Sequence, residues 1–134
     1  MSEAVNLKVV QDGYAAFARG DVQAIVNALA DDVVWHSVYG AGSHVPGAGE
    51  RHGKAAVAEF FKILSETFKF KQFDVRDFVA SGNKVVALGH FAGTSDAGRT
   101  VDSDFASVFT MREGKIARFQ DFNDSSQMNA AFAK

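Results

Sequence analysis

One acidic residue near the C-terminus is the best candidate for chemistry. Asp121 lies between Phe119 and Asn123 in an alternating stretch, so in a strand these three side chains share one face. A carboxylate among aromatic rings loses hydration, and this loss raises its pKa toward the range of a usable general base or acid. Two alternatives are that Asp121 faces solvent, or that it has a structural role and accepts a hydrogen bond from Tyr14 or a backbone N–H.

A second pair of carboxylates lies on another predicted strand. Asp102 and Asp104 flank Ser103 and therefore share one face, opposite to that of Phe105. Two carboxylates so placed can form an acid–base pair, or they can be the charged end of a strand. Asp124 precedes a helical pattern and is expected to cap that helix.

The four histidines follow no usual metal-ligand spacing. His44 and His52 lie near Glu50 in a glycine-rich segment, but this set fits no common coordination pattern, so we predict no metal site. His36 and His90 lie on predicted strands, and alternation directs both toward the convex face of the sheet. A bulge that reversed the register would instead bring His90 into a pocket as a partner for the candidate carboxylate.

Helical and strand patterns divide the chain into two halves. Apolar residues at helical spacing predict four helices, over residues 5–18, 22–29, 54–68 and 124–132. β-branched and aromatic residues predict five strands, over residues 33–38, 68–80, 84–94, 99–112 and 115–123. A change of alternation indicates a bulge near Gln72. This order predicts an α+β fold, with a curved antiparallel sheet wrapped by three to four helices.

The segment between the first strand and the third helix has a different composition. Residues Tyr39 to Gly53 contain five glycines and the only proline, which predicts a loop. A loop of this length in a compact domain is often functional, so one hypothesis is that it forms a lid over a binding site.

The composition excludes several classes of function. A chain of 134 residues corresponds to one domain, over residues 1–134, and its lack of cysteine rules out disulfides, thiolate metal sites and a cysteine nucleophile. A net charge of −2 gives no basic surface for nucleic acid. The sequence contains no apolar run that could span a membrane and no signal-peptide pattern. We therefore expect a cytoplasmic protein that binds neither nucleic acid nor a membrane. The most unusual feature is an excess of phenylalanine, with 13 residues.

Three segments carry a family resemblance. They are the FTMREGKIARFQDFND of residues 109–124, the ARGD of 18–21 with the ADDVVW of 30–35, and the HGK of 52–54 before a helix with paired phenylalanines. Together with the order of elements over nearly the whole chain, they resemble the SnoaL-like, ketosteroid-isomerase-like family of the nuclear-transport-factor-like superfamily. The resemblance implies a cone-shaped, cystatin-like α+β barrel with a deep apolar pocket, no cofactor, and a dimer formed through the sheet.

The resemblance and strand alternation together predict the pocket wall. The residues expected to face inward are Tyr14, Phe17, Trp35, Ser37, Phe61, Phe91, Phe105, Ser107, Phe119, Asp121 and Asn123. A mostly aromatic lining with few polar groups suits a small, largely apolar ligand. In limonene epoxide hydrolases and SnoaL-type cyclases, the position that matches Asp121 carries the working carboxylate.

Other catalytic positions of the family differ in this chain. Ser37 and Ser107 stand where ketosteroid isomerases have a base and an oxyanion donor, and Tyr14 is one residue from the tyrosine position. Gly89 and Phe91 stand where epoxide hydrolases have an arginine and a second carboxylate. We therefore expect neither reaction by those constellations, which leaves one carboxylate to act as the base.

The sheet also has apolar residues on its second face. Ala106 and Val108 point away from the pocket side, as do Ile116 and Phe122 on the last strand. A monomer needs only one apolar face, so this pattern predicts a homodimer through the convex face.

Two functional hypotheses follow from these patterns. The first is an enzyme of isomerase, cyclase, dehydratase or hydrolase type that transfers a proton on a small apolar molecule, with Asp121 as base. The alternative is a non-catalytic ligand-binding or dimeric assembly module. A carboxylate in an open apolar cavity would favour the enzyme, and a pocket filled by its own phenylalanines would favour the module.

Overall fold

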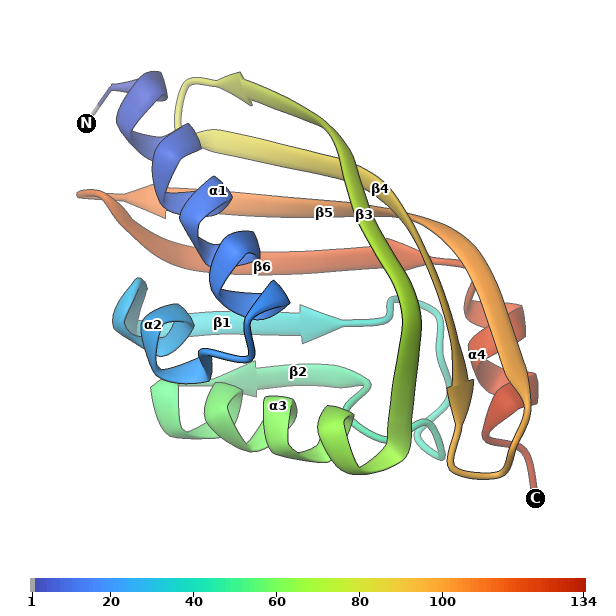
Figure 1. Cartoon of the computed structure of the whole chain (residues 1–134). Helices are drawn as coiled ribbons and strands as arrows, with labels where there is room; N and C mark the ends of the chain where they lie inside the picture. The colour runs from blue at the N-terminus through green and yellow to red at the C-terminus, as the bar shows by residue number, and fades with distance from the viewer. Residues whose placement is uncertain (1) are drawn as a thin grey trace.

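The computed structural model describes residues 2–134. Within this range the helices and strands are, in chain order, α1 (Glu3–Ala18), α2 (Val22–Asn27), β1 (Leu29–Ser37), β2 (Gly49–His52), α3 (Lys54–Thr67), β3 (Phe68–Ser81), β4 (Lys84–Ser95), β5 (Thr100–Arg112), β6 (Lys115–Asn123) and α4 (Ser125–Ala131) (Figure 1). None of the helices in residues 2–134 has the length and apolar character needed to cross a bilayer.

The strands form one sheet in the order β2-β1-β6-β5-β4-β3. The α+β class is confirmed, but the sheet is mixed and open, whereas the order of elements predicted an antiparallel sheet and the family resemblance implied a barrel. The difference comes from β1, which lies parallel to β6 with Trp35 opposite Phe119. The first and last strands of the chain thus lie side by side in the middle of the sheet, and β2 and β3 remain as edges.

The predicted loop contains an additional strand. Gly49–His52 pairs antiparallel with β1 as β2, with Arg51 opposite Trp35. This short edge strand carries mainly polar residues, so hydrophobic alternation gave no sign of it. The rest of the segment folds against α4, where the Gly42 N–H donates to Asn129 Oδ1 at 2.7 Å and Val45 is buried.

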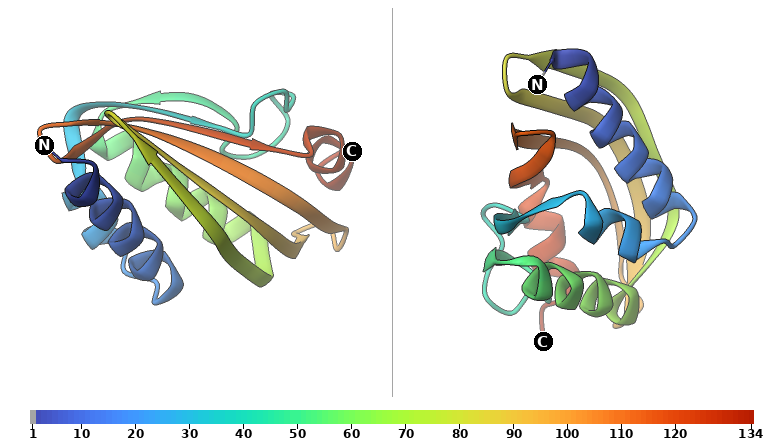
Figure 2. Two further views of the ribbon diagram at one scale, coloured as in Figure 1. Left: turned by 90° about the horizontal axis from the view of Figure 1, so that it is seen from above. Right: turned by 90° about the vertical axis from the view of Figure 1, so that its left-hand side faces the viewer.

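Helices α1, α2 and α3 cover the concave face of the sheet, and α4 lies at one end of it (Figures 1 and 2). The curvature is strongest in the β3–β4 hairpin, where the register shifts after Phe70 and again after Val75. The first shift confirms the bulge predicted near Gln72, since a bulge bends and twists its strand. The lack of a side chain at Gly89 lets the Asp74 backbone and the Phe105 ring approach β4 closely at the bend, because a Cβ there would collide with both.

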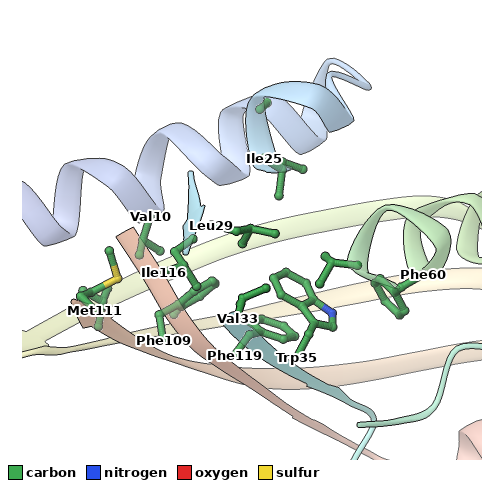
Figure 3. Packing of buried hydrophobic residues seen from close by; sticks show 14 of the residues in the cluster. Val10, Ile25, Leu29, Val33, Trp35, Phe60, Phe109, Met111, Ile116 and Phe119 are labelled. Carbon is green, nitrogen blue, oxygen red and sulfur yellow. The ribbon is translucent and has the colours of Figure 1, made fainter. Parts of the chain in front are cut away.

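The core lies between the helices and the concave face. Val10 of α1 and Ile25 of α2 point toward the sheet, where Trp35 and Phe119 stack with ring centroids 3.9 Å apart (Figure 3). Ile116, which was predicted on the convex face, belongs to this core instead. The register between β5 and β6 shifts at that point, so the alternation of β6 changes after its first residues.

Side chains at the start of α4 fix this helix to β5. The Asp124 carboxylate accepts hydrogen bonds from the N–H groups of Ser126 and Gln127, which confirms the predicted cap. The Gln127 amide also bonds the backbone N–H and carbonyl of Asp102, each at 2.9 Å. These bonds hold α4 over one end of the concave space.

Candidate active site

An aromatic cavity of about 140 Å³ lies between the concave face, the helices and the 39–48 segment. Eleven of the 13 phenylalanines line it: Phe17, Phe60, Phe61, Phe68, Phe70, Phe73, Phe91, Phe105, Phe109, Phe119 and Phe132. Sequence reasoning placed five of these in the wall. Phe109 is a sixth, on the same face of β5 as Phe105. The other five come from the bulged strand β3, from α3 and from the C-terminal end, where alternation alone does not define the inward direction.

The structure brings nearly all of the predicted wall residues together. Tyr14, Trp35, Ser107, Asp121 and Asn123 line the cavity with the aromatic residues named above. Ser37 does not reach the cavity, which corrects the prediction for this residue. It faces inward but is fully covered, and its Oγ accepts a hydrogen bond from Trp35 Nε1 at 3.1 Å. Its role is therefore to orient the indole.

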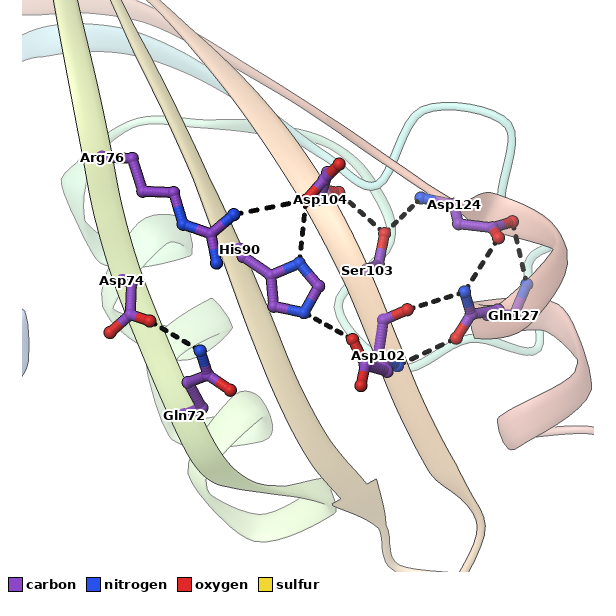
Figure 4. Close-up of polar contacts among 9 residues, drawn as sticks. All are labelled: Gln72, Asp74, Arg76, His90, Asp102, Ser103, Asp104, Asp124 and Gln127. Atoms are coloured by element: carbon purple, nitrogen blue, oxygen red, sulfur yellow. Dashed lines mark hydrogen bonds and ion pairs between the residues drawn. The ribbon is translucent and has the colours of Figure 1, made fainter.

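His90 lies outside the cavity, so its predicted alternative role as a partner for Asp121 is wrong. It stands directly opposite Asp104 in the β4–β5 register, and both side chains lie on the outer side of the sheet. His90 Nδ1 is 2.8 Å from Asp104 Oδ1, and Nε2 contacts Asp102 (Figure 4). The hydrogen bond to Asp104 raises the pKa of His90. The bulges of the hairpin occur in β3, and the register of β4 does not reverse.

The carboxylate of Asp121 is held by Ser107 at the cavity wall. These two residues are directly opposite each other on β6 and β5, and Ser107 Oγ donates to Asp121 Oδ1 at 3.3 Å. Burial raises the pKa of Asp121 to about 6, although hydrogen bonds from Ser107 and the Val38 backbone lower it in part. At neutral pH this carboxylate is ionised in most molecules and is a stronger base than an exposed one.

Tyr14 lies close to this pair, since both Ser107 and Asp121 influence its hydroxyl group. Burial raises the pKa of Tyr14 far above its ordinary value, with the nearby Asp121 adding to the rise. Tyr14 therefore stays protonated at neutral pH, and its hydroxyl is a potential hydrogen-bond donor at the cavity wall.

Comparison with known proteins now identifies the family. Residues 10–119 match the model of the SnoaL-like domain. The chain belongs to the SnoaL-like family. An NTF2-like protein of Burkholderia xenovorans is 28% identical, with a TM-score of 0.88 over 98% of each chain. TerC, crystallised with polyporic acid, is 27% identical, with a TM-score of 0.84 over 97% of this chain and 99% of TerC.

A third solved structure agrees on the fold alone. A protein of Xanthomonas campestris with a cystatin-like fold is 23% identical, with a TM-score of 0.80 over 96% of this chain and 98% of that one. No functionally curated protein matches the chain. The family assignment therefore fixes the architecture of this SnoaL-like protein, while its chemistry has to be argued from the cavity itself.

The three remaining histidines of the SnoaL-like domain are engaged separately. His36 stacks on the Tyr39 ring at 3.7 Å. His44 Nε2 contacts the Asn129 carbonyl at 3.0 Å, and His52 Nε2 contacts Glu50 at 3.1 Å. In the part of the chain that the structure describes, no three histidine or acidic side chains gather in a way that could hold a metal ion. His44 instead ties the 39–48 segment to α4 at the end of the cavity.

Proposed function

We propose that this SnoaL-like protein binds a small, largely apolar molecule in the aromatic cavity and that Asp121 acts on it as a general base. The observation that carries the proposal is the charge of the wall. Among the described residues that line the cavity, Asp121 is the one with an ionisable carboxylate, and the rest are mainly aromatic. Isomerisation, aldol cyclisation, dehydration and hydrolysis can all begin with a proton taken by such a base.

The environment of Asp121 suits this role. A poorly hydrated carboxylate with a pKa of about 6 gains more from taking up a proton than an exposed one does. The Ser107 hydroxyl holds Oδ1, so the carboxylate keeps one orientation toward the cavity. The surrounding rings exclude water that would otherwise compete for the base.

The comparison with TerC supports a small organic ligand. TerC was crystallised with polyporic acid and shares 27% identity with this chain over nearly its whole length. The volume of the cavity points in the same direction, since an apolar cavity of about 150 Å³ holds a benzene ring. One aromatic ring with small substituents is therefore the expected size of ligand.

Proton exchange in D₂O tests the proposal. Acetophenone and 1-indanone are first examined for binding by thermal shift, because a ligand of the native state raises the melting temperature. ¹H NMR then follows exchange of the protons next to the carbonyl group. We expect Asp121→Asn to bind the ketone but to exchange its protons at least ~100-fold more slowly than the wild type. Asp96→Asn, in an exposed turn, is the matched control, and full exchange by Asp121→Asn would refute the proposal.

The alternative of a non-catalytic binding module also has support in the wall. By the family resemblance, Gly89 and Phe91 stand where epoxide hydrolases have an arginine and a second carboxylate, and Phe91 contributes an aromatic ring to this cavity instead. This function predicts that ketones raise the melting temperature of the wild type and of Asp121→Asn equally. It further predicts no exchange above the rate in buffer for either protein.

We also propose that two copies pair through the outer face, the side of the sheet that carries Leu88, Ala106 and Phe122. Leu88 is 38% exposed and Phe122 is 40% exposed, and Ala106 lies between them in register. The Tyr39 ring stacks on Phe122 at 4.6 Å and widens the apolar strip. A continuous apolar strip across three strands is a suitable surface for a two-fold contact.

A further inference from the structure

Asn123 is a polar residue of the cavity wall. It lies on β6 two residues after Asp121, so both side chains face the cavity. Its Oδ1 atom is buried and, within residues 2–134, has no hydrogen-bond partner. A buried acceptor without a donor is costly in free energy, and most such atoms in native proteins are paired.

Three other polar side chains of the wall are already engaged. Ser107 donates to Asp121, and Thr67 Oγ1 donates to the Ile63 carbonyl at 2.8 Å. Trp35 Nε1 donates to Ser37 outside the cavity. In the described part of the wall, Asn123 Oδ1 is therefore the one buried acceptor that lacks a donor, and it is available to a ligand.

The surroundings of Asn123 indicate which kind of ligand fits. Asn123 stands opposite Phe105 in the β5–β6 register. The Phe105 ring stacks with Phe73 at 5.0 Å and lies 6.4 Å from Phe91. Flat aromatic surfaces of this kind favour a ligand with an aromatic ring.

The spacing between Asp121 and Asn123 along β6 indicates where the aromatic ring of a ligand would carry its polar groups. Side chains two residues apart on a strand are ~6.6 Å apart. A single six-membered ring with polar substituents at opposite ends bridges such a span. One end would meet Asn123, and the other end would meet the carboxylate of Asp121.

We infer that Asn123 determines specificity by accepting a hydrogen bond from a ligand hydroxyl, and that the ligand is a small para-hydroxylated aromatic carbonyl compound. The inference rests on the ligand-binding part of the proposed function. It assigns the hydroxyl to Asn123 and the reacting carbonyl end to Asp121.

Calorimetric titration with two matched probes tests the inference. The probes are 4-hydroxyacetophenone and acetophenone, which differ by one hydroxyl group. We expect the wild type to bind 4-hydroxyacetophenone at least ~10-fold more tightly. Asn123→Leu, which keeps the volume but removes the hydrogen bond, should bind both probes with equal affinity. If Asn123→Leu does not fold, Asn123→Ala is used in its place, and it should also lose the preference for 4-hydroxyacetophenone.

The outcomes separate this inference from the proposed function. Equal affinity of the two probes for the wild type, or a hydroxyl preference that survives in Asn123→Leu and Asn123→Ala, would overturn the role of Asn123 alone. Asp121→Asn should retain the preference, because it alters only the base. Failure of both probes to bind would overturn the inference together with the binding function. A hydroxyl preference without proton exchange would support Asn123 and refute catalysis by Asp121.

Discussion

At the scale of single residues, Asp121 and Ser107 form the central contact of the cavity. The carboxylate lies beside the aromatic rings of the cavity and accepts a hydrogen bond from Ser107, a residue that is only 3% exposed. Desolvation and hydrogen bonding act on this carboxylate in opposite directions, and desolvation is the stronger. The pKa of Asp121 is therefore sensitive to the loss of a single hydrogen bond.

Removal of the Ser107 hydroxyl should raise the pKa of Asp121 further. Ser107→Ala deletes a hydrogen bond that favours the ionised carboxylate. A hydrogen bond to a charged group contributes ~1.5 kcal/mol or more, which corresponds to a change of about one unit in pKa. The midpoint of Asp121 in an NMR titration should move upward by about that amount. Ser81→Ala, at the exposed end of β3, should leave it unchanged. A midpoint that stays the same or falls in Ser107→Ala would contradict the hydrogen-bonded pair.

The raised pKa of Asp121 also predicts a dependence of stability on pH. Its value rises from 3.8 to about 6 on folding, so the folded state favours the protonated form. The resulting stabilisation is present in full below about pH 4 and is lost as pH rises through about 6, and it amounts to about 2–3 kcal/mol. Asp121→Asn lacks this titration.

Urea unfolding at pH 4.5 and pH 8 measures this effect as a difference between two proteins. As the pH rises from 4.5 to 8, the free energy of unfolding should fall more for the wild type than for Asp121→Asn. The variant should therefore be the more stable protein at pH 8. Other groups titrate equally in both proteins and cancel. Parallel pH profiles would show that Asp121 is not desolvated.

At the scale of elements, the sequence predicted most helices and strands but not how the strands pair. Periodicity identified β3 to β6 and the bulge near Gln72, because their side chains alternate between a covered and an open face. It did not identify β2, which is short and polar, or the parallel pairing of β1 with β6. Pairing between strands far apart in the chain depends on tertiary packing, which local alternation does not encode.

The bend of β4 predicts opposite effects for one substitution at two glycines. Gly89→Ala adds a methyl group against the Phe105 ring and the Asp74 backbone, so it should destabilise the protein by ~1–3 kcal/mol. Gly13→Ala, in α1, meets no atom within 4 Å and should stabilise it by ~0.5–1 kcal/mol through helix propensity. Thermal unfolding measures both changes. If Gly89→Ala were neutral, the close approach of β3 and β5 would not be the cause of the bend.

At the scale of the whole molecule, the two faces of the sheet have different roles. The concave face and helices enclose the cavity, whereas the outer face carries both the apolar strip and the His90 cluster with Asp102 and Asp104. Sequence alternation assigned most residues to the correct face, including Asp121 and Asn123. It missed the pairing of His90 with its two carboxylates, because cross-strand register depends on the turn between β4 and β5.

The proposed dimer predicts a change in mass for one outer-face variant. Phe122→Glu places a charge in the apolar strip, and burying that charge at a two-fold contact is unfavourable. Light scattering should give twice the chain mass of 14.4 kDa for the wild type and a single chain mass for Phe122→Glu. Val5→Glu, on the exposed side of α1, should remain dimeric. A monomeric wild type would contradict the proposal.

The titration of Asp121 is the decisive measurement for the proposed function, because every step of the proposed chemistry depends on a desolvated carboxylate at the cavity wall. The measurement is the ¹³Cγ chemical shift of Asp121 as a function of pH in the otherwise unmodified protein. We expect a midpoint near 6 that belongs to this residue, with the signal absent in Asp121→Asn. A midpoint near 4, the ordinary value of an exposed aspartate, would contradict it.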